Sequence, residues 1–251
     1  MAATAVIRDP AAHARSLGLD PARLPRHLAV IMDGNGRWAR KRGWERFLGH
    51  RRGADTVRAI TTECVQLGIQ RLTLYAFSSE NWSRPPREIA VLMELLAQFL
   101  RSELPVMQEN NVRLQAIGRL DRLPAEVRAV LDANLAATAG NTGMVLCLAL
   151  SYGGRDELVD ACRRLATRAA RGELAPEAID TDTVQAELYA GDDVDLVVRT
   201  AGEQRISNFL PWQAAYAEFV TCRPLWPDFT LDDLRACLIE YQGRERRFGL
   251  V

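Results

Sequence analysis

Short apolar runs alternate along this chain with segments whose apolar residues recur at helical spacing. The runs that predict strands cover residues 27–32, 72–77, 112–117, 144–150, 194–199 and 218–221. The spacing predicts helices over about 50–67, about 86–105, after Pro124, about 155–171 and about 230–243. Strands that alternate with helices pair in parallel, because each helix carries the chain back across the sheet. The pattern therefore predicts an α/β protein with a mostly parallel six-stranded central sheet covered by helices.

The division of the 251 residues into domains follows from the same pattern. Residues 1–24 carry no strand and are predicted to be a variable, loosely attached leader with some helical character. Charged residues interrupt the apolar residues of this leader, so a signal peptide is not expected. Residues 25–251 contain no linker or repeat and are predicted to form one domain. Pro105 is expected to kink or end its helix, since proline lacks a backbone N–H.

Charge and cysteine content exclude some classes of function. Lys and Arg number 32 and equal Asp and Glu, and no nucleic-acid-binding motif is present, so nucleic acid is not an expected partner. Five scattered cysteines without a C-x-x-C pair favour reduced thiols and a cytoplasmic protein. The longest apolar run, residues 144–150, is too short to span a bilayer. The basic runs at 40–42 and 244–247 are either solvated or in peripheral contact with anionic lipid at the inner face of the membrane.

Three polar clusters follow predicted strands, at residues 33–37, 78–84 and 199–207. In open parallel sheets, ligands bind beyond the carboxyl ends of the strands. The coincidence of three such clusters favours one shared site over three unrelated surface loops. Any anion site must be local, because the chain as a whole carries no net charge.

The first cluster combines an acid, two glycines and an arginine. Gly34 and Gly36 let the backbone approach a ligand and present N–H groups to phosphate, and a helix predicted to begin near Arg37 adds further N–H donors. Asp33 offers the oxygen ligands that Mg²⁺ prefers beside a substrate phosphate. Taken alone, this segment fits a plain turn with an Asp cap equally well.

A dinucleotide-binding turn is the competing interpretation of the same segment. Gly34, Gly36 and Ala39 satisfy the G-x-G-x-x-A spacing, and Asp55 lies at about the required distance beyond them. That acid should end a second strand, whereas Asp55 falls inside a helical pattern. The spacing alone therefore gives this interpretation little support.

The other two clusters supply further phosphate ligands. Ser78 and Arg84 follow the second strand, and Arg199, Arg205 and Ser207 surround a glycine after the fifth. Hydroxyl and guanidinium groups both bind phosphate oxygens well. Each cluster could also be an ordinary surface loop.

Two isolated residues remain candidates for the site. His50 lies in a Gly-His-Arg-Arg-Gly context, and phosphate contact and a structural role are equally open to it. Glu218, on the last short strand, is a candidate metal ligand.

An ordered set of segments resembles the cis-prenyltransferase family, whose bacterial type is undecaprenyl diphosphate synthase. The most specific are HLAVIMDGNGRWA at 27–39 and YAFSSENWSRP at 75–85. The others lie in order at residues 49–50, 152–155, 195–200, 202–203, 205–213 and 246–249. Each short segment is a weak signal, but their order from about residue 25 to the C-terminus is very specific.

The resemblance implies a homodimeric, Mg²⁺-dependent enzyme with an apolar tunnel beneath its active site. The expected reaction condenses isopentenyl diphosphate onto an allylic diphosphate such as farnesyl diphosphate, with each new double bond cis. The expected product is undecaprenyl diphosphate, which is used to make the lipid carrier of cell-wall synthesis; a short- or medium-chain product of C15 to C50 is the alternative. Residues 25–251 would be the catalytic domain.

The resemblance also implies roles for individual residues. Asp33 would bind Mg²⁺ and help the allylic diphosphate leave, with Glu218 completing the metal site. Asn81 would lie where the proton leaves; since an amide is a poor base, a diphosphate oxygen is the better acceptor. The allylic diphosphate would be held by Gly34, Asn35, Gly36, Arg37, Arg46 and His50. Isopentenyl diphosphate would be bound by Arg199, Arg205 and Ser207, and Ile206 is a further expected substrate contact. Trp38 and Trp82 would line the pocket near the prenyl group, and Ser78 and Arg84 would support the reacting geometry. Ser79 and Glu80 are further expected substrate contacts.

Some residues depart from the family pattern or bear on other classes. Ala201 stands where glycine or serine is usual, and residues 144–151 differ from the commonest forms at the tunnel floor. The D-D-x-x-D motif of trans-prenyltransferases is absent. An inactive partner subunit would lack Asp33 and the phosphate-binding arginines, which are present.

The tunnel is expected to be lined by Ile89, Leu92, Met93, Leu96 and Phe99, and by the run from Met144.

Overall fold

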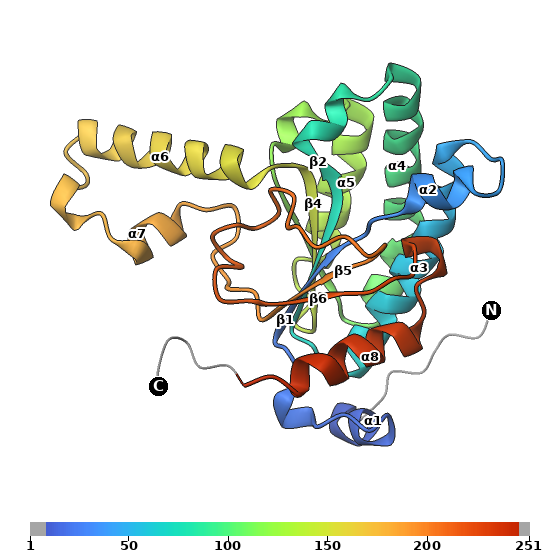
Figure 1. Ribbon diagram of the computed structural model, residues 1–251. Coiled ribbons are helices and arrows are strands. Elements are labelled where there is room, and N and C mark those ends of the chain that lie inside the picture. Colours follow the sequence, from blue (N-terminus) through green and yellow to red (C-terminus); the bar gives the residue numbers. More distant parts are fainter. Residues whose placement is uncertain (1–8, 246–251) are drawn as a thin grey trace.

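The computed structural model describes residues 9–245, which form a parallel six-stranded sheet with helices packed on it (Figure 1). The strands lie in the order β3-β4-β2-β1-β5-β6. This confirms the predicted fold class, with every pairing between neighbouring strands parallel. The strands are β1 (His27–Ile31), β2 (Arg71–Ser78), β3 (Arg113–Ile117), β4 (Val145–Tyr152), β5 (Leu196–Arg199) and β6 (Glu218–Thr221).

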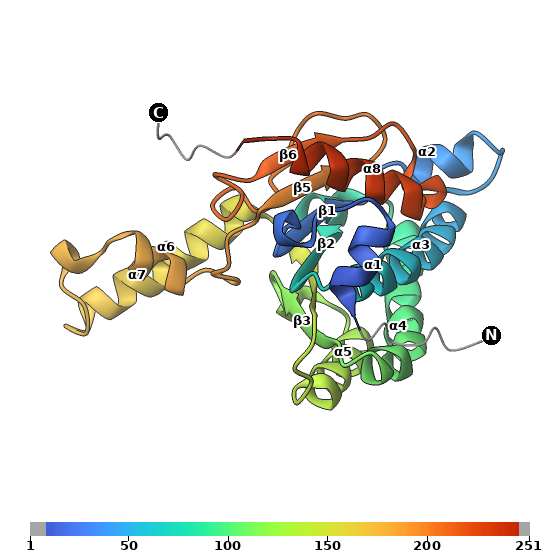
Figure 2. The same cartoon turned by 90° about the horizontal axis from the view of Figure 1, so that it is seen from below.

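Apolar side chains on alternate strand residues divide the core between the two faces of the sheet. Leu28 and Val30 belong to a large core with residues of the helices, whereas Ala29 and Ile31 face the other way. Viewed from below, α1, α3, α4, α5 and α8 lie around the sheet on the helix-covered side (Figure 2). The helices are α1 (Pro10–Ser16), α2 (Asn35–Arg40), α3 (Arg46–Gln66), α4 (Pro86–Glu109), α5 (Ala125–Thr138), α6 (Gly154–Ala170), α7 (Thr181–Ala186) and α8 (Leu231–Gln242).

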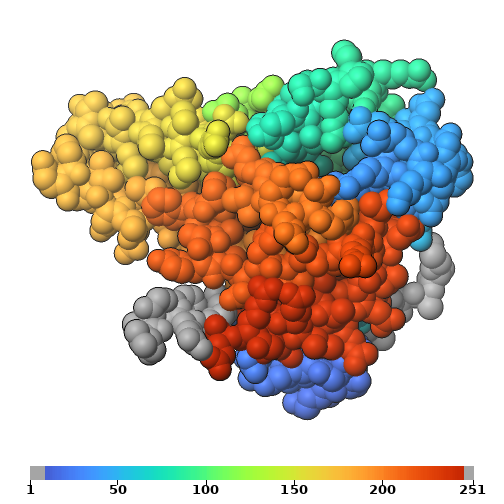
Figure 3. Space-filling model, viewed as in Figure 1, coloured from blue at the N-terminus to red at the C-terminus, as the bar shows by residue number. Residues whose placement is uncertain are grey.

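The second face of the sheet is covered mainly by irregular chain. Phe209 and Leu210 are buried there, and the ring of Phe209 stacks on Tyr75 with centroids 4.4 Å apart. In the space-filling view, the orange and red C-terminal third covers the middle and lower part of the visible face, and the yellow α6–α7 segment projects to one side (Figure 3). Among the described residues, no helix combines the length and the apolarity needed to cross a bilayer.

Two expectations about secondary structure are corrected. Residues 10–24 are not loosely attached, because Ala14 and Leu19 are buried in the main core and His13 lies 2.9 Å from Glu63. The helix containing Pro105 neither ends nor breaks there, because α4 runs on to Glu109. The free energy gained by burying α4 side chains on both sides of Pro105 exceeds the cost of the backbone hydrogen bond that the proline cannot donate. The boundary at residue 24 stays a prediction, and residues 1–8 and 246–249 lie outside the described part of the chain.

His27 at the start of β1 is buried as a neutral imidazole. Its Nδ1 donates to the carbonyl of Asp193 at 2.9 Å, so its Nε2 accepts from the Thr73 hydroxyl at 2.8 Å. Burial is the main cause that lowers the pKa of His27 from 6.5 to about 4.

We expect this histidine to make the fold acid-sensitive. Between pH 6.5 and 4 the unfolded chain binds a proton that folded His27 rejects, so stability falls as the pH falls through that window. From pH 7 to 4.5 the His27 contribution to the free energy of unfolding should fall by about 2 kcal/mol. Urea unfolding of the parent and His27→Gln at both pH values measures it. An equal acid loss in both proteins would contradict the assignment.

Candidate active site

The three polar clusters lie together because the strands that they follow are neighbours. β1 pairs with β2 on one side and with β5 on the other, all in the same direction. The segments after Ile31, Ser78 and Arg199 therefore leave the same edge of the sheet, in the centre of Figure 1. Asp55, the acid required by the dinucleotide interpretation, lies inside α3 and pairs with Arg52 at 2.8 Å.

The turn between β1 and α2 requires glycine at position 34. Gly34 caps α2 with a φ of +104°, a conformation that favours glycine. A Cβ on Gly34 would also lie 2.8 Å from the side chain of Leu225, and one on Gly36 would lie 2.9 Å from Arg46 Nε. No side chain caps the helix, so its first N–H groups remain available to a ligand.

The glycines of α3 let it pack directly on this turn. A Cβ on Gly49 would lie 1.9 Å from the Asn35 carbonyl oxygen, and one on Gly53 would lie 2.4 Å from Asn35 Oδ1. The Asn35 Nδ2 donates to the Met32 carbonyl at 3.0 Å, whereas its buried Oδ1 has no hydrogen-bond partner. Asn35 therefore serves to fix the turn, and it also lines the cavities described below.

Asp33 lies between two arginines. Its Oδ2 accepts from Arg199 at 2.8 Å, and its Oδ1 lies 3.2 Å from Arg37. The Thr200 hydroxyl donates to the Asp33 backbone carbonyl at 2.7 Å and holds the main chain in place. Burial opposes ionisation of this carboxyl, but the hydrogen bond and charge of Arg199, with the charge of Arg37, hold its pKa below the ordinary value. Asp33 is therefore an anion at neutral pH.

The same chain of ion pairs continues into the third cluster. Glu203 accepts from Arg37 at 2.9 Å and from Arg205 at 2.7 Å. Arg199, only 3% exposed, donates to the Ser207 hydroxyl at 2.8 Å and to the Arg205 carbonyl. The cations of both clusters are thus paired with acids, and an incoming diphosphate would compete for them.

The loop after β5 has an unusual backbone. Ala201, Ser207 and Asn208 all have positive φ, at 71°, 49° and 62°. This explains why the Ala201 position suits glycine, since a Cβ is disfavoured in that conformation. Asn208 donates to Glu80 at 3.0 Å and accepts from the Arg155 backbone N–H at 2.8 Å, and so joins this loop to the second cluster and to α6.

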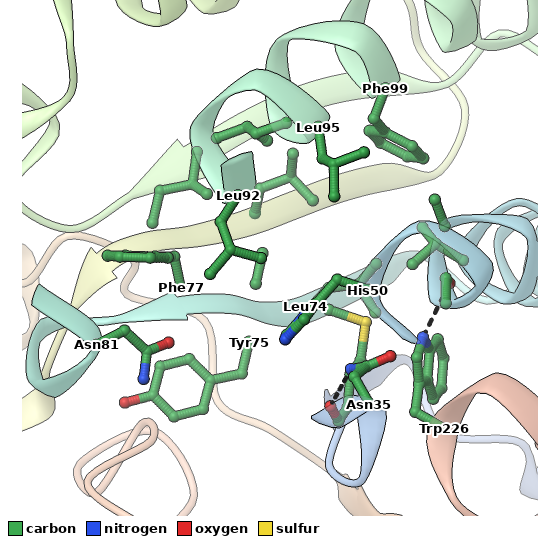
Figure 4. A pocket seen from close by; sticks show the side chains of 18 of the residues that line it. Asn35, His50, Leu74, Tyr75, Phe77, Asn81, Leu92, Leu95, Phe99 and Trp226 are labelled. Carbon is green, nitrogen blue, oxygen red and sulfur yellow. Dashed lines mark hydrogen bonds between the residues drawn. The ribbon is translucent and has the colours of Figure 1, made fainter. Parts of the chain in front are cut away.

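Two adjacent cavities occupy the site. A polar one of about 360 Å³ is lined by residues of all three clusters. An apolar one of about 190 Å³ extends beneath it between α3, α4 and the sheet (Figure 4). Their shared lining residues are Met32, Asn35, His50 and Arg84. A ligand with an anionic head and an apolar tail fits this pair of cavities.

The junction between the cavities carries two of the predicted residues. Burial, followed by the charges of Arg84 and Arg46, lowers the pKa of His50 to about 4, so its ring is neutral at pH 7. Asn81 lines the apolar cavity, and its Oδ1 accepts the Ser78 backbone N–H at 3.2 Å. Its amide group is therefore held in place, with Nδ2 available as a donor.

Several predicted residues lie on the cavity walls and others do not. The polar cavity contains Asp33, Gly34, Asn35, Gly36, Arg37, Arg46, His50, Arg84 and Arg205. Of the predicted tunnel residues on α4, Leu92, Met93, Leu96 and Phe99 line the apolar cavity, and Ile89 does not. From β4, the lining residues are Leu148 and Leu150.

The two predicted tryptophans are directed elsewhere. Trp38 donates to Asp228 at 2.6 Å and Trp82 donates to the Ser151 hydroxyl at 2.9 Å. Neither lines either cavity, and both have a structural role in this state of the chain. Ile206 is 40% exposed on the outer side of its loop.

Three further residues of the second cluster hold the loop itself. The Ser78 side chain caps the short helix that follows it, and Glu80 accepts from Asn208. Ser79 lies against Gly153, where a Cβ would come within 2.5 Å of its hydroxyl.

Glu218 is not brought to Asp33 within one chain. It is the first residue of β6 and is in register with Leu196 of β5. Leu196 is in turn in register with Leu28 of β1. Asp33 lies five residues beyond Leu28, or about 16 Å along the sheet. Glu218 instead accepts from Arg244 at 2.7 Å. The predicted pair of metal ligands therefore cannot form inside a single chain.

Sequence reasoning missed three contributors. Glu203 bridges Arg37 and Arg205, Arg40 lines the polar cavity, and Asn208 joins two clusters. Each lies within or beside a segment that the sequence analysis places at the site, so the sequence predicts that it lies near the site. The missing information was the direction of each side chain.

The donor set fits a metal that shares its ligands with a substrate. Within residues 9–245, no group of three or more acidic, histidine or cysteine side chains could hold an ion alone. One ionised carboxylate, Asp33, lies in a polar cavity with cations placed for phosphate. Mg²⁺ commonly binds one or two carboxylates and completes its shell with phosphate oxygens and water.

The fold and cavities define an enzyme that holds diphosphates above an apolar pocket, and the comparisons with known proteins agree. The sequence profile of the family described as "Putative undecaprenyl diphosphate synthase" matches residues 31–249. An isoprenyl transferase of Geobacter sulfurreducens is 49% identical over 234 residues, which cover 92% of this chain and 95% of that protein.

Two further relatives support the same assignment. The ditrans,polycis-undecaprenyl-diphosphate synthase ((2E,6E)-farnesyl-diphosphate specific) of Lactiplantibacillus plantarum is 46% identical over 96% of this chain and 95% of its own. The crystal structure of lavandulyl diphosphate synthase from Lavandula x intermedia, in complex with dimethylallyl diphosphate, superposes with a TM-score of 0.88 at 36% identity, covering 91% of this chain and 99% of that one. This chain belongs to the undecaprenyl diphosphate synthase family of prenyltransferases.

Proposed function

We propose that this enzyme catalyses the Mg²⁺-dependent condensation of isopentenyl diphosphate onto farnesyl diphosphate, forming undecaprenyl diphosphate with cis double bonds. The observation that carries the proposal is the polar cavity, with Asp33 among arginines, next to an apolar cavity whose lining suits a prenyl tail. The printed name of the Lactiplantibacillus relative supports the farnesyl primer and the product. A C15 to C50 product is the alternative.

The allylic diphosphate would occupy the charged cavity. Isopentenyl diphosphate would bind beside it, where Arg205 on the cavity wall meets Arg199 and Ser207, which do not line the cavity. Gly34, Gly36 and Arg37 would hold the allylic diphosphate, with Arg46 and His50 beside it. Arg199, Arg205 and Ser207 would hold isopentenyl diphosphate; their hydrogen bonds to one another support this grouping. Because His50 is neutral at pH 7, it would act as a hydrogen-bond donor and not as a charge.

The reaction breaks the allylic carbon–oxygen bond, joins that carbon to the terminal alkene carbon of isopentenyl diphosphate, and releases a proton as the new double bond forms. Bound Mg²⁺ would neutralise charge on the leaving diphosphate, and Asp33 would hold it there. Arg37 and the N–H groups of α2 stabilise the same developing charge. Asn81 orients the substrate, while a diphosphate oxygen accepts the proton.

The assembly and location of the enzyme are part of the proposal. We expect a homodimer, and the projecting α6–α7 segment with its 46% exposed Val159 is a surface that a second copy could cover. Since Glu218 lies far from Asp33 in its own chain, it could join a metal site only from another copy. The enzyme would work in the cytoplasm, with at most peripheral contact with the membrane through exposed Arg40, Lys41 and Arg42.

The proposal is tested by incubating the protein with Mg²⁺, farnesyl diphosphate and radiolabelled isopentenyl diphosphate. Chromatography of the dephosphorylated products should show a cis-polyprenol series, and chelation of the metal should abolish it. Absence of product from farnesyl and every shorter allylic primer would refute the activity.

A further inference from the structure

The strand β4 ends in an irregular step at Ser151. Phe77 of β2 is in register with Leu150. The next residue of β2, Ser78, is in register with Tyr152. Ser151 is therefore an extra residue between the two pairs, which makes it the bulged residue of this ladder. Bulges are common beside active sites, because they direct a side chain where a regular strand would not.

The burial of the β4 side chains shows the effect of the bulge. Leu148 and Leu150 belong to the main core beneath the helices, and Ala149 belongs to the core on the other face. Strict alternation would return Tyr152 to the main core, but it lies in the core on the other face. The extra residue thus reverses the alternation, and Ser151 is only 1% exposed.

Ser151 adopts a backbone conformation that is unfavourable for serine. Its φ is +49°, in the left-handed region where a Cβ approaches the following carbonyl oxygen. The carbonyl of Ser151 accepts the Arg119 N–H at 3.2 Å, so the segment after β3 helps to hold it there. Strained residues that the surrounding structure holds in place are often found at functional sites.

The hydroxyl of this strained residue holds an indole ring. Trp82 Nε1 donates to Ser151 Oγ at 2.9 Å. The Trp82 ring also packs edge to face on Phe77, with centroids 4.9 Å apart, and the Arg122 guanidinium lies 5.1 Å from its centroid. Of these three contacts, the hydrogen bond is the directional one, so it fixes where Nε1 points.

Trp82 belongs to the short helix η2 (Ser79–Ser83) and lies between two residues of the site. Asn81 precedes it and lines the apolar cavity, and Arg84 follows it and lines both cavities. The Arg84 N–H donates to the Asn81 carbonyl at 3.1 Å, which ties the two together. Asn81 lies at the same end of the pocket as Phe77, the residue on which the indole packs (Figure 4). A shift of the indole would therefore displace both cavity residues.

We propose that Ser151 is a positioning residue, whose hydroxyl anchors Trp82 and thereby sets the positions of Asn81 and Arg84 for the reaction. Ser151 lines neither cavity and acts through the indole. The inference rests on the proposed function, because that function assigns Asn81 and Arg84 to the substrate. It accounts for serine at a position where glycine would fit the backbone without strain.

Two substitutions separate the hydroxyl from the backbone strain. Ser151→Gly and Ser151→Ala both remove the hydrogen-bond acceptor, but only glycine relieves the strain. We expect kcat to fall about tenfold in both, since small displacements of groups that contact substrate are costly. Thermal unfolding should show a higher Tm for Ser151→Gly than for Ser151→Ala. A kcat that follows this order of stability, with Ser151→Gly near the parent, would overturn the proposal.

Asn111→Gly is the matched control. Asn111 also has a positive φ, of 54°, and its side chain also makes hydrogen bonds, to Thr142. It lies between α4 and β3, at the opposite end of the sheet from Ser151. Its kcat should stay within about twofold of the parent, as is usual for exposed residues away from a site.

The indole N–H of Trp82 gives a readout that needs no substrate. In protein labelled with nitrogen-isotope tryptophan, NMR separates the signals of the five indoles, and the Trp82 signal is the one absent from Trp82→Phe. This signal should move upfield in both Ser151 variants, because the hydrogen bond is lost, and should not move in Asn111→Gly. An unchanged Trp82 signal, or parental kcat in both Ser151 variants, would contradict the positioning role. Absence of product from the parent would refute the proposed function instead, and the NMR signal would still report the anchor.

Discussion

Asp33→Ala should lower turnover on the order of a hundredfold or more. Asp33 is an anion held between Arg37 and Arg199. Its carboxylate would bind the metal that neutralises the leaving diphosphate. Without the carboxylate, both arginines remain free to bind the diphosphate in its ground state. Steady-state kinetics should therefore show a large fall in kcat with little rise in the allylic KM. Asp33→Asn, which keeps the shape and removes the charge, should behave like Asp33→Ala.

The matched control for this change is Asp55→Asn. Asp55 lies on α3, pairs with Arg52, and lines none of the cavities described above. We expect its turnover to stay within about twofold of the parent, since surface ion pairs contribute little. Asp33 variants with near-parental turnover, or an Asp55 variant with a large loss, would contradict the assignment of the catalytic carboxylate.

Arg199→Met should reduce kcat/KM for isopentenyl diphosphate by about a hundredfold, the range expected when one partner of a buried charge pair is removed. Arg199 is 3% exposed and holds Asp33, the Ser207 hydroxyl and the Arg205 carbonyl together. Its loss would remove one of the proposed diphosphate ligands and release the loop that carries the others, Arg205 and Ser207. We expect the KM for isopentenyl diphosphate to rise more than the KM for the allylic substrate.

The pH profile provides a second, independent readout of Arg199. Among the groups that lower the pKa of Asp33, Arg199 has the largest effect. Its removal should raise that pKa, so the acidic limb of the rate profile should move to higher pH. Arg71→Met, which removes an arginine paired with Asp192 at the opposite end of the sheet, should destabilise the fold without moving that limb. Equal acidic limbs for the parent and Arg199→Met would contradict the coupling.

The sheet and the meeting of the three clusters could be predicted because they depend on pattern alone. Apolar runs of strand length alternate with helical spacing, and parallel strands bring their carboxyl ends to one edge. Asp33, Ser78 and Arg199 follow strands that turned out to be neighbours. The path of α4 through Pro105 could not be predicted, because its continuation depends on burial by distant elements.

Side-chain direction at the site could not be predicted from the sequence. Trp38 and Trp82 lie close in sequence to cavity residues, yet hydrogen bonds to Asp228 and Ser151 direct their rings elsewhere. Glu218 follows a polar cluster along the chain, but strand register places it at the opposite end of the sheet. The direction of a side chain and the register of a strand can be known only from the tertiary structure. The pairing of Glu203 with Arg37 and Arg205 is a further example.

The central claim is that two diphosphates bind side by side on separate groups of residues, one group in the charged cavity and the other next to it. Its most direct test is a crystal structure with Mg²⁺, isopentenyl diphosphate and a farnesyl diphosphate analogue whose bridging oxygen is replaced by sulfur. We predict the allylic diphosphate on Gly34, Gly36 and Arg37, and the isopentenyl diphosphate on Arg199 and Ser207, with the farnesyl tail in the apolar cavity. Binding of either diphosphate away from these residues, or of the tail outside the apolar cavity, would contradict the account.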